Sequence, residues 1–297
     1  MGNQVHKDGS PKPKNIPGRI PWPDGPPYEQ YFSLPDSIIY YITMNPSTPN
    51  CYLKIIQSCK YFFEKNSILV VKHMEETSIC PNENCSKLCC ETYFVKRTAS
   101  KFWLTKKLFL LSVEPSFIPK SLRPKIYKSQ IKKLGIHDTK VNFVDFLFFA
   151  STVEILYLTS VGMTYNDGKN VMLEKILEAV PNVKEFLFSI DGVSVITELT
   201  LKHISKLQNL SNFKKLTLVG ITETLNLEDL CSFSKARKDI KFEIYFLTNQ
   251  IFQQYNDQLD EIIAAEKQAE NTQYALNNEV PKNIRDVIEL PDTVDKD

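Results

Sequence analysis

The hexapeptide VEILYL, residues 153–158, decides the fold class because its pattern recurs along the chain. VKEFLF at 183–188 and FKKLTL at 213–218 also carry apolar residues at the first, fourth and sixth places, so the three segments follow one another at equal intervals. Three other segments keep all or part of the pattern: 105–110, 131–136 and 241–246. A short apolar segment of this kind predicts a buried β-strand.

Helix-like segments separate the predicted strands, at residues 142–151, 170–180, 199–210 and 226–236. A strand followed by a helix, repeated at similar intervals, predicts an α/β fold built as a degenerate leucine-rich-repeat-type solenoid over residues 101–265. The Asn that usually follows each strand of such a repeat is replaced in most units, and only Asn249 conforms. An ordinary α/β domain is therefore the alternative.

An apolar block at residues 31–74 precedes the repeat. Pro35 suits the first turn of a helix, where its missing N–H is not needed. The apolar stripe of that helix comprises Leu34, Ile38, Ile39 and Ile42. A second helical stripe runs through CYLKIIQSCKYFFEKN at 51–66. The pattern predicts a compact helical hairpin that is too small to bury all of its own apolar surface.

The remaining segments differ in composition. Residues 1–30 are rich in proline and predict a disordered arm, since such a segment cannot bury enough apolar surface to offset its ordering entropy. Residues 75–100 form a cysteine-containing connector. A helix beginning at Ile251 is expected to cap the repeat, and residues 266–297 predict an acidic, largely disordered tail.

The connector raises the question of a metal site. Four thiols close together in the chain, Cys80, Cys85, Cys89 and Cys90, match zinc by number, with His73 nearby as a spare ligand. However, adjacent cysteines rarely reach one metal and no paired C-x-x-C motif occurs. We expect no metal and no cofactor, with zinc as the alternative.

Composition and motifs exclude several classes of function. A net charge of +1 does not favour a nucleic-acid or membrane partner. The basic, aromatic stretch 96–133 could bind RNA or DNA, but it also fits a strand flanked by solvated lysines, and the acidic tail balances its charge. No apolar run is long enough for a membrane span and no signal peptide is evident, so we expect a cytoplasmic or nuclear protein. Nucleotide-binding, hydrolase and metalloprotease motifs are absent from the sequence, so no enzymatic activity is expected.

The block at 31–74 resembles an F-box. LPDSIIYYI, a proline-marked break and YLKIIQSCKYF follow the family pattern, and Leu34 and Cys59 are spaced as the family spaces its Leu and Cys. Phe62 stands at the place of the customary Trp and Tyr61 at that of the usual basic residue. The whole chain, over about residues 31–262, resembles a nematode-expanded family that joins such a hairpin to a degenerate repeat domain. The likeness lies in sequence segments such as QSCKYFFEKN, FWLTKKL, VNFVDFLFFAS and KFEIYF.

The resemblance implies a substrate receptor of a cullin-based ubiquitin ligase. Residues 31–65 would dock the Skp-type adaptor, and the repeat domain would hold an unidentified protein target. The partner-binding residues expected from this likeness and from the apolar patch are Leu34, Pro35, Ile38, Ile39, Ile42, Leu53, Ile56 and Phe62.

The alternative is a protein- or RNA-binding repeat module without a ligase connection, in which the hairpin is only a cap. Solvent exposure of Leu34, Ile38 and Phe62 distinguishes the two hypotheses. These side chains are exposed if the hairpin docks an adaptor, and they are buried internally if the hairpin is only a cap.

Overall fold

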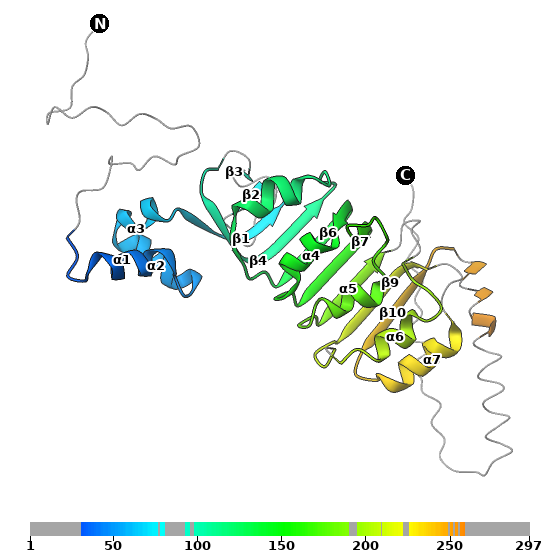
Figure 1. Cartoon of the computed structure of the whole chain (residues 1–297). Coiled ribbons are helices and arrows are strands. Elements are labelled where there is room, and N and C mark those ends of the chain that lie inside the picture. The colour runs from blue at the N-terminus through cyan, green and yellow to red at the C-terminus, as the bar shows by residue number, and fades with distance from the viewer. Residues whose placement is uncertain are drawn as a thin grey trace, which may run out of the picture.

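The chain forms an α/β protein in which a block of helices precedes a ten-stranded sheet (Figure 1). The structure is a computed structural model. It describes residues 31–258 except 77, 81–92, 96–97, 190–194, 209, 222–225, 249, 252 and 255. The expectations for the arm at 1–30, the tail at 266–297 and three of the four clustered cysteines (Cys85, Cys89 and Cys90) lie outside the described residues.

Three helices, rather than two, form the N-terminal block: α1 (Asp36–Met44), α2 (Pro49–Ser58) and α3 (Lys60–Lys65). The side chain of Thr48 begins α2 by accepting a hydrogen bond from the backbone N–H of Cys51. The sequence predicts one helix across 51–66, but Cys59 is extended, with φ −155° and ψ 131°, and divides that helix in two. The helical expectation is confirmed, and the hairpin is corrected to a three-helix block.

Residues 68–75 differ from the expectation, because the sequence places most of them in the helical block. They form β1 (Ile68–Glu75), which pairs in parallel with β4 (Lys101–Leu111). The short strands β2 (Ser78–Cys80) and β3 (Tyr93–Phe94) extend the sheet beyond β1 in antiparallel pairing. The connector predicted at 75–100 therefore contributes two strands to the sheet.

The six predicted strands all form, and the larger part of the sheet is parallel. They are β4, β6 (Lys133–Asn142), β7 (Ile155–Thr164), β8 (Glu185–Ser189), β9 (Lys215–Ile221) and β10 (Lys241–Phe246). With β1 and the short β5 (Ile126–Ser129), which pairs with β4, eight strands are mutually parallel. Along the sheet the order is β10-β9-β8-β7-β6-β4-β1-β2-β3, so the long strands lie side by side in chain order.

Helices connect the parallel strands. They are α4 (Phe143–Ala150), α5 (Leu173–Glu178), α6 (Thr200–Ser205) and α7 (Leu227–Ala236), each within a predicted helical segment, and the short helical turns Ile118–Leu122 and Arg123–Lys125. Figure 1 shows α4 to α7 on one and the same face of the sheet.

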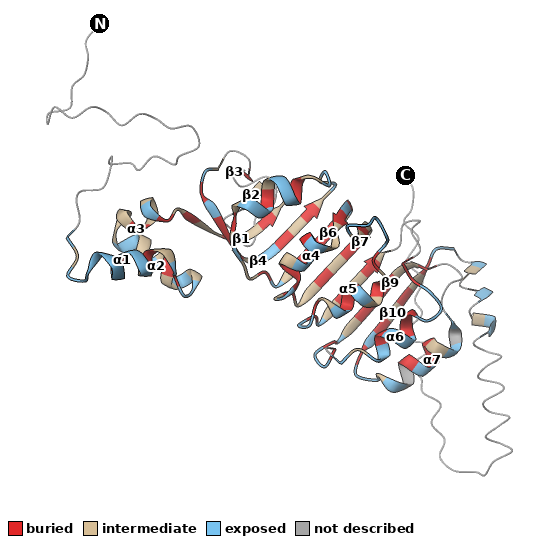
Figure 2. Ribbon diagram, viewed as in Figure 1, coloured by how far each residue is buried: buried red, intermediate tan, exposed pale blue. Residues whose placement is uncertain are grey.

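The repeated hexapeptide supplies the core beneath these helices. In β7 to β9 the fourth and sixth places are buried, and Val153, Val183 and Phe213 at the first place are fully buried. The intervening residues Tyr157 and Leu187 are only partly buried, and this alternation appears as stripes along the strands in Figure 2. The equivalent Thr217 of β9 is buried. Among the described residues, helices cover one face of the sheet and leave the other, which we call the open face, without a helical layer.

Candidate partner-binding surfaces

The outer side of α1 is apolar and exposed. Leu34 and Ile38, four residues apart, are 48% and 46% exposed, and Tyr41, three residues further, is 65% exposed. Tyr31 and Tyr40 add two more exposed aromatic rings. Because residues three apart share a helix face, Ile38 and Tyr41 lie on one side of α1. We call the five exposed side chains together the α1 surface.

The opposite side of α1 is held in the block. Ile39 and Thr43 are buried, and the Thr43 hydroxyl donates a hydrogen bond to the Ile39 carbonyl at 2.6 Å. The amide of the buried Asn66 donates to the Thr43 carbonyl at 2.8 Å. Residue Asn66 lies directly after α3, so this bond fixes the orientation of α1 and leaves the α1 surface turned outward.

The structure divides the eight predicted partner-binding residues into three groups. Leu34, Pro35 and Ile38 are exposed; Ile42, Leu53 and Ile56 are half-buried; Ile39 and Phe62 are buried. The rings of Phe32 and Tyr61 cover Phe62, with ring centroids 5.5 and 5.7 Å away. Ile39 and Phe62 therefore support the block from inside, whereas Leu34 and Ile38 are accessible to a partner.

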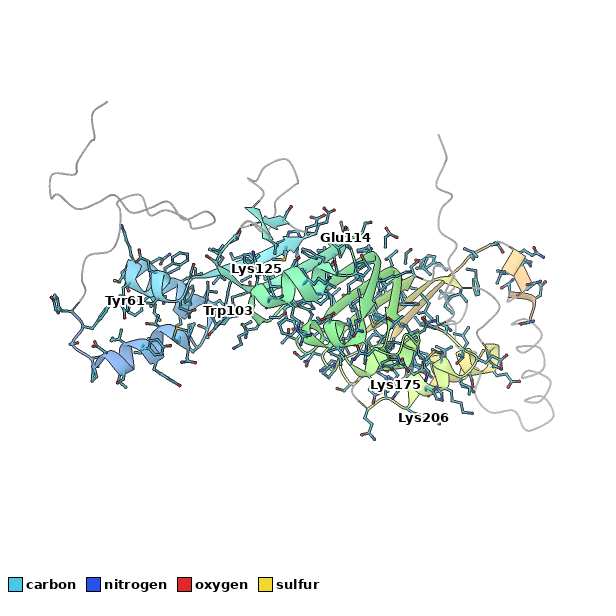
Figure 3. The ribbon with its side chains drawn as sticks, turned by 45° about the horizontal axis from the view of Figure 1, so that its top comes forward. Tyr61, Trp103, Glu114, Lys125, Lys175 and Lys206 are labelled. Carbon is cyan, nitrogen blue, oxygen red and sulfur yellow. The ribbon has the colours of Figure 1, made fainter. Side chains whose placement is uncertain are left out.

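An aromatic cluster joins the helical block to the sheet. Tyr52 of α2 and Trp103 of β4 are buried together with Ile68, and Ile56 packs against them. The Tyr52 hydroxyl donates to the Asn66 carbonyl and accepts from the Ile68 N–H. Burial raises the pKa of Tyr52 to about 12, so the hydroxyl keeps its proton and can donate. In Figure 3, Tyr61 lies within the block and Trp103 lies where the block meets the sheet.

The open face of the sheet carries two rows of side chains in register across the strands. The first, the lysine row, crosses from β4 to β10 and comprises Lys107, Lys133, Ile155, Glu185, Lys215 and Lys241. The second, the central row, comprises Phe109, Gly135, Tyr157, Leu187, Thr217 and Glu243. A basic row thus lies beside a row with an aromatic and apolar centre.

An aromatic and cationic cluster occupies the β1–β7 part of this face. The ammonium group of Lys133 lies 4.3 Å from the Tyr157 ring centroid and 5.7 Å from that of Phe109. The Phe109 ring also stacks on His137 and meets His73 edge-on. Gly135 makes room for the Phe109 ring, because a Cβ atom there would lie 2.6 Å from Cε1 of Phe109. Burial lowers the pKa of His73, so its ring is uncharged near neutral pH.

Two lysine–glutamate groups join neighbouring strands of the sheet. Glu154, just before β7, binds Lys132 at 2.6 Å on one side and Lys184 at 2.7 Å on the other. Glu243 of β10 binds both Lys215 and Lys241 at 2.8 Å. Burial alone would raise the pKa of Glu243, but hydrogen bonds from the two lysines and from Thr217 lower it overall. Each carboxylate is shared by two lysines, which leaves each group with a net positive charge.

The Glu154 group predicts a pH-dependent contribution to stability. Hydrogen bonds from Lys132 and Lys184 lower the pKa of Glu154 from 4.5 to about 2. The stabilisation is therefore complete above pH 4.5 and is lost as the pH falls towards 2. We expect Glu154→Gln to be less stable than the wild type at pH 7, with the difference narrowing below pH 4.5. Urea denaturation at a series of pH values measures this difference in the free energy of unfolding. The narrowing should disappear in a Lys132→Met, Lys184→Met background, and its persistence there would contradict the assignment.

The described residues contain no cluster of three or more His, Cys, Asp or Glu side chains placed to hold a metal ion. Of the four clustered cysteines only the backbone of Cys80 is described, in β2, so the zinc alternative stays untested. Within the same residues, every helix is too short or too polar to cross a bilayer.

Sequence reasoning missed the exposed tyrosines and the open-face cluster. Tyr41 continues the helical spacing of Leu34 and Ile38, which was a usable signal. The third and fifth places of the repeated hexapeptide form the open face, so Lys133, Gly135 and Tyr157 could have been assigned to it in the same way.

Comparison with known proteins adds no family. None of the protein-family models matches the chain, and a search of curated proteins finds no significant match.

Proposed function

We propose that the chain is an F-box-like substrate receptor of a cullin-based ubiquitin ligase. The α1 surface docks a Skp-type adaptor, and the strand–helix domain, acting as a degenerate leucine-rich-repeat-type solenoid, holds a protein target. The observation that carries the proposal is the exposure of Ile38 on α1, and of Leu34 just before it, while the other side of this helix is already packed.

Exposed apolar surface supports docking because clustered aromatic and aliphatic side chains usually mark an interface. The α1 surface combines two aliphatic side chains with Tyr31, Tyr40 and Tyr41. Tyrosine is favoured at interfaces because its ring buries apolar area while its hydroxyl forms a hydrogen bond.

The order of the strands supports the proposal of a repeat solenoid. From β6 to β10 each strand pairs in parallel with the next strand in the chain, and the register partners Ile155, Glu185 and Lys215 recur at equal intervals along it. Stacked strand–helix units of similar length give this arrangement.

The test is co-purification with a Skp-type adaptor after co-expression. We expect Leu34→Asp, Ile38→Asp to weaken adaptor binding about tenfold or more, since charges would enter an apolar contact. Val144→Asp, Leu147→Asp is the matched control, because these residues of α4 are 45% and 43% exposed at a distant surface. Both variants should keep the wild-type circular dichroism spectrum. Equal adaptor binding by the two variants would overturn the proposal.

A second candidate is the repeat module in which the helical block only caps the sheet. The contact of Tyr52 with Ile68 and Trp103 favours it, since it ties the block to β1 and β4. The burial of Phe62 also favours it, since that ring is not accessible to a partner. If the wild-type chain retains no adaptor, this candidate replaces the first.

A further inference from the structure

The open face of the sheet has a charge pattern that selects among partners. Helices α4 to α7 lie on the opposite face (Figure 1), so the lysine row is turned away from them. Lys107 is exposed, and the side chains of Lys215 and Lys241 are 39% and 69% exposed. Lys107 and Lys133 are neighbours on β4 and β6, and Lys215 and Lys241 are neighbours on β9 and β10.

The two lysine pairs lie at opposite ends of an apolar stretch. Ile155 and Glu185 separate them in the lysine row, and Tyr157 and Leu187 lie beside these two residues in the central row. Lys215 and Lys241 share Glu243, so that group keeps a net positive charge. Across the strands the face therefore offers a lysine pair, an apolar stretch, and a second lysine pair that has Glu185 and Glu243 beside it.

We propose that this face binds an extended acidic segment of a protein, with acidic side chains at the two lysine pairs and apolar side chains on Tyr157 and Leu187. The inference rests on the proposed receptor function, because it names the class of target that the strand–helix domain would hold.

A peptide fits this surface better than a nucleic acid. Glu185 and Glu243 are interspersed with the lysines along the face. They would repel a backbone that carries a charge at every nucleotide. A peptide with acidic groups only at its ends brings fewer charges close to these carboxylates and uses the apolar centre as well.

The strand spacing sets the spacing of the acidic residues. The centres of the two lysine pairs are four strand intervals apart, which is about 19 Å at about 4.8 Å per strand. An extended peptide advances about 3.3 Å per residue, so its acidic groups should be centred about six residues apart.

The probe is a fluorescein-labelled peptide of about twelve residues, with glutamate pairs centred about six residues apart and leucines between them. Its binding to the purified full chain is followed by fluorescence anisotropy. We expect Lys107→Glu, Lys241→Glu to weaken binding about tenfold or more, since each reversal replaces an attraction by a repulsion. Lys202→Glu, Lys206→Glu carries the same charge change on the helix-covered side, where Figure 3 shows Lys206, and should change binding less than about twofold.

Two further probes complete the test. A peptide of the same composition with its glutamates contiguous should bind several-fold more weakly, and a uridine oligonucleotide should not compete. The inference would be overturned if the spaced peptide did not bind. It would also be overturned if the two lysine variants lost the same amount of peptide affinity, or if the oligonucleotide bound more tightly than the peptide. The assay contains no adaptor, so a failure here is separate from a failure of adaptor docking, which is measured on the α1 variants.

Discussion

Replacing Trp103 with alanine is expected to lower the free energy of unfolding by about 3–5 kcal/mol, the range for large aromatic side chains removed from a core. Trp103 is fully buried, its indole N–H donates to Gln130 at 2.8 Å, and its ring meets that of Tyr127 at 5.4 Å. Tyr127 in turn donates a hydrogen bond to the Met44 carbonyl at the end of α1. Loss of the indole therefore weakens both the sheet and its attachment to the helical block.

Urea denaturation followed by circular dichroism measures this change. Trp103→Phe is the matched variant: it keeps much of the apolar volume, loses the bond to Gln130, and should cost less than the alanine variant. The sequence has one other tryptophan, Trp22, so a Trp22→Phe background lets fluorescence report on Trp103 alone. A loss of less than about 1 kcal/mol in Trp103→Ala would contradict the cluster as the junction between block and sheet.

Gly135→Ala is expected to lower the free energy of unfolding by about 1–3 kcal/mol, since the added methyl group forces the Phe109 ring to move. The methyl group would lie 2.6 Å from Cε1 of Phe109 and closer still to Cδ1, with Nε2 of His137 at 3.2 Å. Because Phe109 contacts His73, Lys133 and His137, its displacement should also weaken peptide binding to the open face.

Gly162→Ala provides the control within the same sheet. Its nearest neighbour would be Cγ of Lys140 at 3.4 Å, an ordinary contact with a flexible side chain. We expect stability to change by less than about 0.5 kcal/mol in this variant. Equal losses in the two glycine variants would show that the cost comes from the alanine in the strand rather than from the Phe109 ring.

The strands of the sheet and the helices that cover it could be predicted because one apolar pattern determines both the local structure and the core. The residues at the fourth and sixth places of each hexapeptide, such as Leu156 and Leu158, are buried under the helices. The predicted helical segments contain α4 to α7 for the same reason, since their apolar stripes pack on those strands.

Strand β1 escaped prediction because its signal is not local. Its register with β4 shifts between Val71 and His73, and its partner strand begins beyond the cysteine-containing segment. The paired strand is therefore remote in the sequence, and the alternation of buried and exposed residues along β1 is interrupted. For these two reasons the sequence of β1 resembles a continuation of the preceding helical block. Similarly, the break at Cys59 carries no glycine or proline signal, and the helical spacing of Tyr52, Ile56 and Phe63 continues across it.

The candidate surfaces were predictable only in part. Apolar periodicity identified Leu34 and Ile38, but it assigned Ile39 and Phe62 to the same surface, because a sequence stripe does not show which side faces the neighbouring helices. The lysine row needed the register between strands, which aligns Lys107 with Lys133 and Lys215 with Lys241.

The agreement between chain order and sheet order has a consequence for synthesis on the ribosome. From β4 to β10, each long strand closes a loop of similar length onto the strand made just before it. The entropy of closing such loops differs by less than about 0.4 kcal/mol, so no later pairing is much harder than an earlier one. The sheet can thus grow by accretion while the polypeptide emerges, each nascent strand meeting an edge that is already in place.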